Sequence, residues 1–264
     1  MCQELGDEYF RDVIISSTVY RIYKCGRCGL EYTSPMPSKD VLSSFYFDYF
    51  DVRADSKVVE LNSIRNLSTL KNLGLESGDS VLDFGSGTGT FVHSAGVNCF
   101  GYEPMAPFDM DEKKGGGGCY RCLDEIPVRS FKFVTMWGVL EHLVDPNDVV
   151  SSISELLSST GTLVLTTVNS EGVIPYHYKP PEHLTYWTRK SLEYLGLASG
   201  LQLVSVMPYT MLQLTKVYLD RILSRTPLPF QELIKKQILE LPEIIEIPTN
   251  ELIAVFKKVT FSED

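Results

Sequence analysis

A glycine-rich stretch in the first half of the chain has the residue types needed to bind a ligand. The segment 81–84 reads as a short buried strand, and it leads directly into Gly85, Gly87 and Gly89. Glycine permits a positive φ and lets a ligand approach the backbone, because it carries no Cβ. The helix expected after this turn presents unpaired N–H groups and the positive end of its dipole, and both favour an anionic ligand group.

Two carboxylates accompany the glycines. Asp83 precedes the first of them, and Glu103 ends a second apolar segment, 98–103, which places it 18 residues beyond Gly85. An acidic residue near this spacing can accept hydrogen bonds from the ribose hydroxyls of a bound nucleoside. The glycines and Glu103 together predict a nucleoside-binding crevice at the end of a strand.

The stretch Val81-Leu82-Asp83-Phe84-Gly85-Ser86-Gly87-Thr88-Gly89 resembles the first motif of class I S-adenosylmethionine-dependent methyltransferases. The acid before the glycines is characteristic of that motif and is usually lacking in dinucleotide-binding dehydrogenases. The resemblance extends over roughly residues 57–207. It implies that S-adenosylmethionine is the cofactor, with its methionine part beside Asp83, Gly85, Gly87 and Gly89 and its ribose on Glu103.

A second part of the resemblance begins at the apolar segment 131–137. This segment runs into Gly138-Val139-Leu140-Glu141-His142-Leu143-Val144-Asp145-Pro146, which is similar to the fourth motif in the small-molecule branch of these enzymes. The resemblance implies that Leu123 and Asp124 lie against the adenine and that Trp137 lies near the methyl-bearing sulfur. Trp137 can equally be a core residue at the end of a strand.

Two histidines are candidate catalytic bases. Histidine titrates near neutral pH, which suits accepting a proton from an alcohol. His142 lies in the motif above, where a structural histidine at a helix start is the alternative interpretation, and His183 lies in a proline-rich, aromatic loop expected to border the substrate. Some methyltransferases with a similar motif hold magnesium with Glu-x-x-Glu-His. Because Gly138 occupies the first of those positions, no metal is expected at Glu141 and His142.

Residues 1–40 are expected to form a small ribbon ahead of a methyltransferase domain at 41–264. Cys25 and Cys28 form a C-x2-C knuckle that suits zinc, but Leu5 stands where an upstream thiol would complete a second knuckle with Cys2. Several methyltransferase families resemble this layout, with zinc in the ribbon. We interpret the segment here as a degenerate ribbon without metal, while zinc with a donor from elsewhere stays the alternative.

Packing must then hold such a ribbon together, and the expected contacts join Val19, Ile22, Leu30 and Tyr32 to the aromatic segment 45–50. Beyond the ribbon, the threefold spacing of apolar residues predicts a helix over 56–73. Strands alternating with helical stretches predict an α/β fold, a doubly wound, seven-stranded and mostly parallel Rossmann-like sheet. A helical insertion is expected at about 210–248, followed by a last, antiparallel strand at 250–259.

Composition narrows the function further. The chain has 264 residues, with 34 acidic and 24 basic side chains and a formal charge of −10. This acidity disfavours nucleic acid as a partner, which would need clustered Lys and Arg. No apolar stretch is long enough for a membrane helix, and the acidic N-terminus lacks the apolar core of a signal peptide. A cytoplasmic location is therefore expected, with the cysteines reduced.

The leading hypothesis is methyl transfer from S-adenosylmethionine to a small molecule, with a hydroxyl of a sugar or secondary metabolite as the expected acceptor. A catalytically silent methyltransferase fold acting as a binding subunit is the alternative from another class. A nicotinamide-dependent oxidoreductase is disfavoured by Asp83 and by the Glu141-His142-Leu143 run. The identity of the acceptor and the oligomeric state are left open by these patterns.

Overall fold

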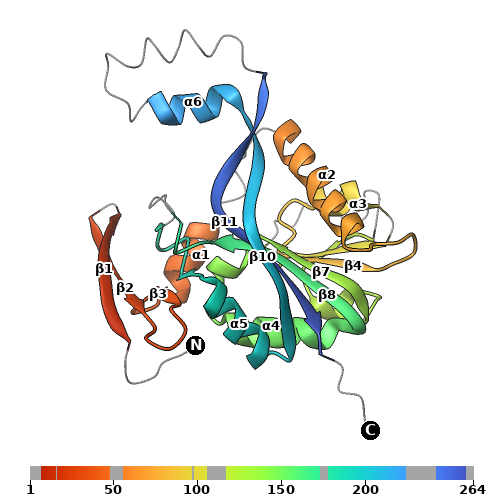
Figure 1. Cartoon of the computed structure of the whole chain (residues 1–264), viewed down its shortest axis with the longest axis horizontal. Coiled ribbons are helices and arrows are strands. Elements are labelled where there is room, and N and C mark those ends of the chain that lie inside the picture. The colour runs from red at the N-terminus through yellow and green to blue at the C-terminus, as the bar shows by residue number, and fades with distance from the viewer. Residues whose placement is uncertain are drawn as a thin grey trace.

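The computed structural model describes residues 7–15, 17–47, 56–96, 98–105, 117–172, 178–223 and 242–259, and every structural statement below concerns these residues. They form two sheets. One has seven strands in the order β10-β11-β8-β7-β4-β5-β6, and the other has four in the order β1-β2-β3-β9 (Figure 1).

The seven-stranded sheet confirms the fold predicted from the sequence. Its parallel strands come from alternating strand and helix segments, and one antiparallel strand, β11, is inserted between β8 and β10. The strands are β4 (Val81–Phe84), β5 (Cys99–Tyr102), β6 (Cys119–Tyr120), β7 (Phe131–Trp137), β8 (Leu157–Val168), β10 (Leu201–Leu214) and β11 (Ile244–Lys258).

Helices cover both faces of this sheet, so its central strands are apolar on both sides. Alternate residues of a strand point to opposite faces, and the core is accordingly divided. Val81 and Phe133 pack under α2 (Ser56–Asn72) and α3 (Thr90–Ala95), whereas Leu82 and Val134 pack with α4 (Pro146–Leu156) and α5 (Arg189–Ala198). Figure 1 shows the two helix pairs on opposite sides of the sheet.

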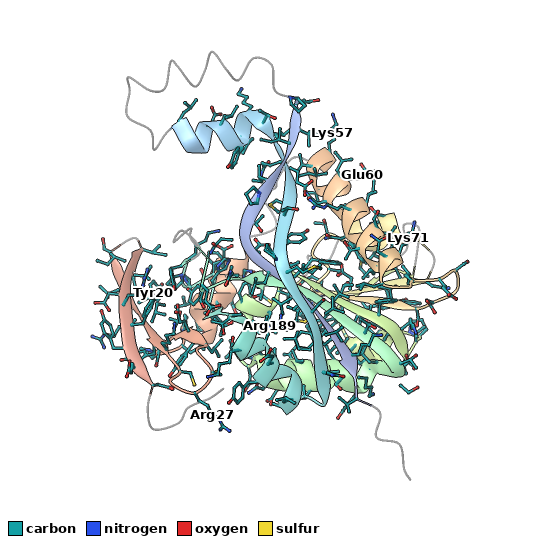
Figure 2. All side chains as sticks on the ribbon, viewed as in Figure 1. Tyr20, Arg27, Lys57, Glu60, Lys71 and Arg189 are labelled. Carbon is teal, nitrogen blue, oxygen red and sulfur yellow. The ribbon has the colours of Figure 1, made fainter. Side chains whose placement is uncertain are left out.

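The helix expected at 56–73 is present as α2, and its polar face points outward. Lys57, Glu60 and Lys71 are exposed and project away from the sheet (Figure 2). Leu67 and Leu70 on the opposite side are buried against the strands. No described helix combines the length and the apolar character that crossing a bilayer would require.

The N-terminal ribbon shares both a sheet and a core with the rest of the chain. Its strands are β1 (Glu8–Ile15), β2 (Thr18–Lys24) and β3 (Glu31–Thr33), and β3 pairs with β9 (Thr185–Tyr186). Cys25, Cys28 and Leu30 are buried in the same apolar cluster as α4 and α5. The ribbon is therefore fixed to the larger domain by main-chain pairing and by burial.

The contacts expected to hold the ribbon are correct in part. Ile22, Leu30 and Tyr32 are buried, but Val19 is 54% exposed. Ile22 packs against Val168 and Tyr186 of the larger domain. Of that segment, the structure describes only 45–47, at the end of α1 (Lys39–Phe47).

The degenerate-ribbon interpretation stays a prediction. Among the described His, Cys, Asp and Glu side chains, no group of three that could hold a metal includes Cys25 or Cys28. Cys2 and Leu5, on which the comparison with a complete zinc ribbon depends, lie outside the described residues.

The prediction of a helical insertion at 210–248 is wrong at both ends of that range. Residues 210–214 belong to β10 and residues 244–248 to β11, and the two strands pair with each other beyond the edge of β8 (Figure 1). Within the insertion, α6 (Thr215–Leu223) is the described helix, and 224–241 lie outside the described residues. Cross-strand pairing overrides the helix propensity of Met211, Leu212 and Gln213.

Helix α5 offers a test of how local capping supports this fold. The hydroxyl of Thr188 accepts from the Ser191 amide at 3.0 Å, and the Ser191 hydroxyl accepts from the Thr188 amide at 2.8 Å. Thr188→Ala should lower the free energy of unfolding by about 1–2 kcal/mol, because it leaves a buried helix N–H without its acceptor. Urea denaturation measures this loss.

Thr188→Ser is the matched control, because it keeps the capping hydroxyl and should retain most of the stability. Equal destabilisation by both substitutions would show that the methyl group, and not the cap, stabilises this position.

Candidate active site

The glycine turn after β4 adopts the conformation expected from its sequence. Gly85, Gly87 and Gly89 have φ of 77°, 56° and 75°, a region that side-chain-bearing residues rarely occupy. A Cβ on Gly85 would lie 2.6 Å from the Val139 side chain, and one on Gly89 would lie 2.6 Å from the Cys119 sulfur. For Gly87, no described atom lies within 4 Å of that position. The middle glycine therefore borders open space, as a ligand-facing residue should.

Glu103 closes the other side of this turn. Its Oε2 accepts from the Gly87 amide at 3.1 Å, and its Oε1 accepts from the Met105 amide at 3.2 Å. Burial raises the pKa of Glu103, and these two backbone hydrogen bonds oppose the rise. The carboxylate thus lies directly against the open glycine, although the two residues are 16 positions apart.

Asp83 lies inside the sheet at the end of β4. Its side chain is buried, and its Oδ1 accepts from the Thr135 hydroxyl on β7 at 2.7 Å. Burial raises the pKa of Asp83 to about 7; the Thr135 hydrogen bond opposes this rise and the charge of Glu103 adds to it. A buried acid of this kind is stabilised in its ionised form by a nearby cation.

Trp137 ends β7, the strand next to β4 in the sheet. Its ring packs against Phe91, with centroids 5.6 Å apart. The indole Nε1 is buried, and no described residue accepts a hydrogen bond from it. Because buried N–H groups are nearly always paired, this donor indicates an acceptor supplied by something other than the described chain.

Leu123 and Asp124 lie farther along the same edge, in a short 3₁₀ helix, η1 (Leu123–Glu125), that follows β6. Leu123 packs partly against the core, whereas the Asp124 side chain is 96% exposed. Arg129 donates to the carbonyls of both residues at 2.7 Å and so fixes the turn. The Leu123 side chain is partly buried, while Asp124 faces solvent.

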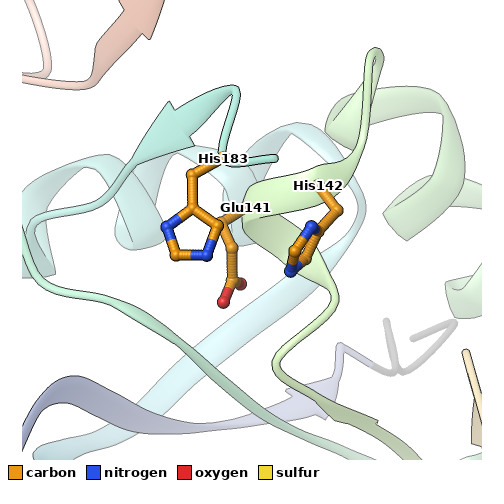
Figure 3. A group of neighbouring side chains, drawn as sticks. All are labelled: Glu141, His142 and His183. Carbon is orange, nitrogen blue, oxygen red and sulfur yellow. The ribbon is translucent and has the colours of Figure 1, made fainter. Parts of the chain in front are cut away.

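A second group of ionisable residues follows β7. Glu141 and His142 lie in a 3₁₀ helix, η2 (Leu140–His142), and His183 comes from the loop before β9. One oxygen or nitrogen of each side chain lies within 4.8 Å of the others. The two imidazole rings are perpendicular, with centroids 5.0 Å apart, and Figure 3 shows Glu141 between them. These three side chains are called the carboxylate–histidine cluster below.

Main-chain hydrogen bonds bring the distant loop to η2. The Leu184 amide donates to the Glu141 carbonyl at 2.7 Å, and the Thr185 hydroxyl donates to the Leu140 carbonyl at 3.4 Å. The Thr167 hydroxyl on β8 then donates to Glu141 Oε2 at 2.9 Å. The carboxylate is thus oriented from the strand below it, while the loop places His183 beside it.

Burial sets the electrostatics of this cluster. Burial raises the pKa of Glu141 to about 8, and the charge of Glu251 adds to the effect. Burial lowers the pKa of His142 to about 4, against the opposing effect of a hydrogen bond to the Glu182 main chain. The His142 ring is therefore neutral near pH 7.

Sequence reasoning named His142 and His183 but missed the acidic residues around them. From the sequence, Glu141 is considered only as a possible metal ligand at which no metal is expected, and Glu251 is not included. Glu251 is a charged residue at the start of the apolar run Leu252–Phe256, and its pKa is raised by burial. A carboxylate entering an otherwise apolar strand is the signal that could have identified it.

The sequence and the fold both match known proteins. A family profile described as a methyltransferase domain matches residues 61–206, more than half of the chain. The chain belongs to this methyltransferase family. No curated protein sequence matches it. Family membership assigns S-adenosylmethionine-dependent methyl transfer as the activity class, and the nicotinamide-dependent alternative is set aside.

Solved structures share the fold of this methyltransferase at low sequence identity. One match is a chain from the complex between the Haloferax volcanii Trm112 methyltransferase activator and a methyltransferase. The two chains superpose with a TM-score of 0.54 at 15% identity, and the alignment covers 84% of this chain and 99% of the Haloferax volcanii chain. A methyltransferase from Archaeoglobus fulgidus has a TM-score of 0.52 and 19% identity, covering 81% and 99%. The 1,6-didemethyltoxoflavin-N1-methyltransferase of Burkholderia thailandensis has a TM-score of 0.52 and 14% identity, covering 95% and 100%.

The residues at the end of β4 fit S-adenosylmethionine chemically. The open side of Gly87 admits a ligand, and the buried indole N–H of Trp137 has no acceptor among the described residues. Asp83 and Glu103 suit a cationic nucleoside that carries hydroxyls. The assignment of each residue to a part of the cofactor stays a prediction.

Substituting the middle glycine tests that assignment. Gly87→Val should weaken S-adenosylmethionine by about tenfold or more, because its methyl groups would fill the open side of the turn. Isothermal titration calorimetry measures the affinity. Gly200→Val is a matched control for backbone strain, since Gly200 has φ of 68° and a Cβ there would meet only an atom at 3.9 Å.

Each of the two valine substitutions should lower the free energy of unfolding by about 1–2 kcal/mol, because valine is strained at a positive φ. Only Gly87→Val should reduce the affinity for S-adenosylmethionine. Wild-type affinity in Gly87→Val would remove the turn from the cofactor site.

The raised pKa of Asp83 predicts a pH dependence of binding. Asp83 gains its charge as the pH rises through about 7, and a cationic ligand binds the charged form more tightly. The affinity for S-adenosylmethionine should therefore rise with pH between 6 and 8, by up to about tenfold per unit. In Asp83→Asn, the affinity measured by calorimetry should change much less with pH over this range than it does in the wild-type protein. An unchanged slope in that variant would assign the titration to another group.

Proposed function

We propose that this methyltransferase transfers the methyl group of S-adenosylmethionine to a hydroxyl oxygen of a small molecule. One observation carries the proposal. The carboxylate–histidine cluster follows β7, and β7 pairs directly with β4, the strand that leads into the glycine turn. A group able to handle a proton thus lies at the same edge of the sheet as the expected cofactor site.

The chemistry explains why that arrangement favours a hydroxyl acceptor. S-adenosylmethionine supplies an electrophilic methyl group on a sulfonium. The protein must align the acceptor and exclude water, and a hydroxyl acceptor must also lose its proton. A neutral imidazole has a nitrogen lone pair for that purpose. His142 and His183 are the residues that we assign to the acceptor side.

The burial of the cluster favours a small acceptor. Glu141 and His183 are 3% and 7% exposed, so a reacting hydroxyl must enter the protein to reach them. A small molecule can do so more readily than a hydroxyl on the surface of a folded macromolecule. The Burkholderia thailandensis structure, which holds 1,6-didemethyltoxoflavin, is one case in which this fold accepts a small molecule.

Asp83, Glu103 and the glycine turn would hold the cofactor from one side, while Leu123 and Asp124 would border its adenine. Trp137, between the turn and the cluster in chain order, would donate its indole N–H to a ligand oxygen. These residues bind and orient, and none of them is assigned a proton-transfer step. These binding roles differ from the roles of the two histidines, and comparing cofactor affinity with kcat can distinguish the two kinds of residue.

Purified protein incubated with S-adenosylmethionine and a panel of sugars and hydroxylated secondary metabolites should yield an O-methylated product by mass spectrometry. His183→Gln should lower kcat by about 100-fold or more while leaving the calorimetric affinity for S-adenosylmethionine unchanged. His93→Gln is the control, because His93 is an exposed histidine on α3.

Methylation of amines or thiols alone would contradict the hydroxyl assignment. S-adenosylmethionine binding without any methylated product over the whole panel would favour a catalytically silent binding subunit.

A further inference from the structure

We propose that the carboxylate–histidine cluster binds a divalent first-row transition-metal ion. Ligating atoms of Glu141, His142 and His183 already lie within 4.8 Å of one another. Such ions bind imidazole nitrogen and carboxylate oxygen at about 2.0–2.2 Å, which places neighbouring ligand atoms about 3–3.5 Å apart. Small rotations of the three side chains would bring them to that separation.

The donor set selects the class of ion. Two imidazole nitrogens and one carboxylate oxygen suit ions such as Mn²⁺, Fe²⁺ and Zn²⁺, whereas Mg²⁺ and Ca²⁺ favour sites made of oxygen alone. The sequence interpretation excluded a metal here because it considered only Glu141 and His142 beside Gly138. The fold adds His183, from a loop about 40 residues later in the chain.

Surrounding groups orient the ligands as the outer shell of a metal site does. Thr167 holds one carboxylate oxygen of Glu141, with its hydroxyl 2.9 Å from Oε2. The His142 ring is hydrogen-bonded to the main chain of Glu182. A ring nitrogen that donates its proton to a carbonyl leaves the other nitrogen in its lone-pair form, which is the form that coordinates a metal.

The charges around the cluster favour a cation. Glu182 and Glu251 both act on Glu141 electrostatically, so three carboxylates share this part of the protein. Lys179 contributes a positive charge that acts on His142 and Glu251. The carboxyl groups of Glu182 and Glu251 beside Glu141 would attract a divalent cation to the cluster.

Gly138 leaves a position on the ion for another ligand. A Cβ on Gly138 would lie 3.8 Å from Glu141 Oε1, so a longer side chain there could reach the same ion. With glycine at this place, the described residues supply three ligands, and a coordination position is left for another ligand. Catalytic metal sites commonly have three protein ligands and one position for water or substrate.

A catalytic role for the ion rests on the proposed function. It would also change the role of the two histidines in methyl transfer. They would act as ligands, and the acceptor hydroxyl would bind at the open position. Coordination lowers the pKa of a bound hydroxyl. Its O–H bond then breaks with the electron pair left on oxygen, and the proton passes to solvent water. That oxygen pair would then form the bond to the methyl carbon as the carbon–sulfur bond of S-adenosylmethionine breaks, and the electron pair of the broken bond would leave with S-adenosylhomocysteine.

Binding of Mn²⁺ alone tests the proposal without any methylation assay. Mn²⁺ suits this test because it favours oxygen and nitrogen donors over thiolates, so Cys25 and Cys28 compete poorly. Protein treated with a chelator and desalted should bind one Mn²⁺ per chain, as shown by loss of the free-ion signal in electron paramagnetic resonance. His183→Gln should weaken binding by about tenfold or more, and His93→Gln should leave it unchanged.

A spectroscopic measurement on the wild-type protein tests the proposal even if the His183→Gln variant misfolds. Pulsed paramagnetic resonance of bound Mn²⁺ should reveal coupling to imidazole nitrogen. Absence of saturable binding, absence of that coupling, or equal affinity in His183→Gln with its fold intact would each overturn the proposal.

The two proposals fail separately. Methyl transfer that proceeds in fully chelated protein lacking Mn²⁺ affinity would leave the proposed function standing and remove the metal. Specific Mn²⁺ binding without methylation of any acceptor would keep the metal site and remove the hydroxyl methyltransferase.

Discussion

The two main-chain polar groups of Leu184 join three parts of this molecule. Its amide donates to the Glu141 carbonyl at 2.7 Å, and its carbonyl accepts from the Thr33 amide at 2.9 Å. The first bond places His183 beside the end of β7, and the second attaches the N-terminal ribbon. Leu184 is fully buried, so loss of either bond would leave a buried polar group unpaired. The ribbon, the loop that carries His183 and the segment that follows β7 are thus positioned together.

Buried carboxylates are the second constraint on this fold. Burial raises the pKa values of Asp83, Glu141 and Glu251, so their charged forms are disfavoured in the folded chain. For Asp83, folding stability falls as the pH rises from its ordinary value of 3.8 towards about 7, because the folded state holds the proton more tightly. All three lie at the end of the sheet where methyl transfer is expected. A cationic ligand there would offset the cost of keeping these groups charged.

Local patterns predicted the parts of the fold that depend on periodicity. The apolar segment 131–137 is a strand, and the threefold spacing before Gly74 is a helix. The region 210–248 was misread because its leucines and isoleucines suit either structure. There the outcome depends on pairing between β10 and β11, whose partners are distant in sequence. Propensity is a weak guide where such pairing is available.

By itself, the sequence determined the glycine turn, because a positive φ at Gly85, Gly87 and Gly89 leaves few other residues possible. It also indicated Glu103 by its spacing from Gly85, and the structure places this residue directly after β5, which pairs with β4. Only the tertiary structure decided that His183 meets Glu141 and that Trp137 keeps a buried N–H without a described acceptor. Those relations depend on main-chain hydrogen bonds and packing between segments far apart in the chain. Such contacts leave no periodic pattern in the residues that make them.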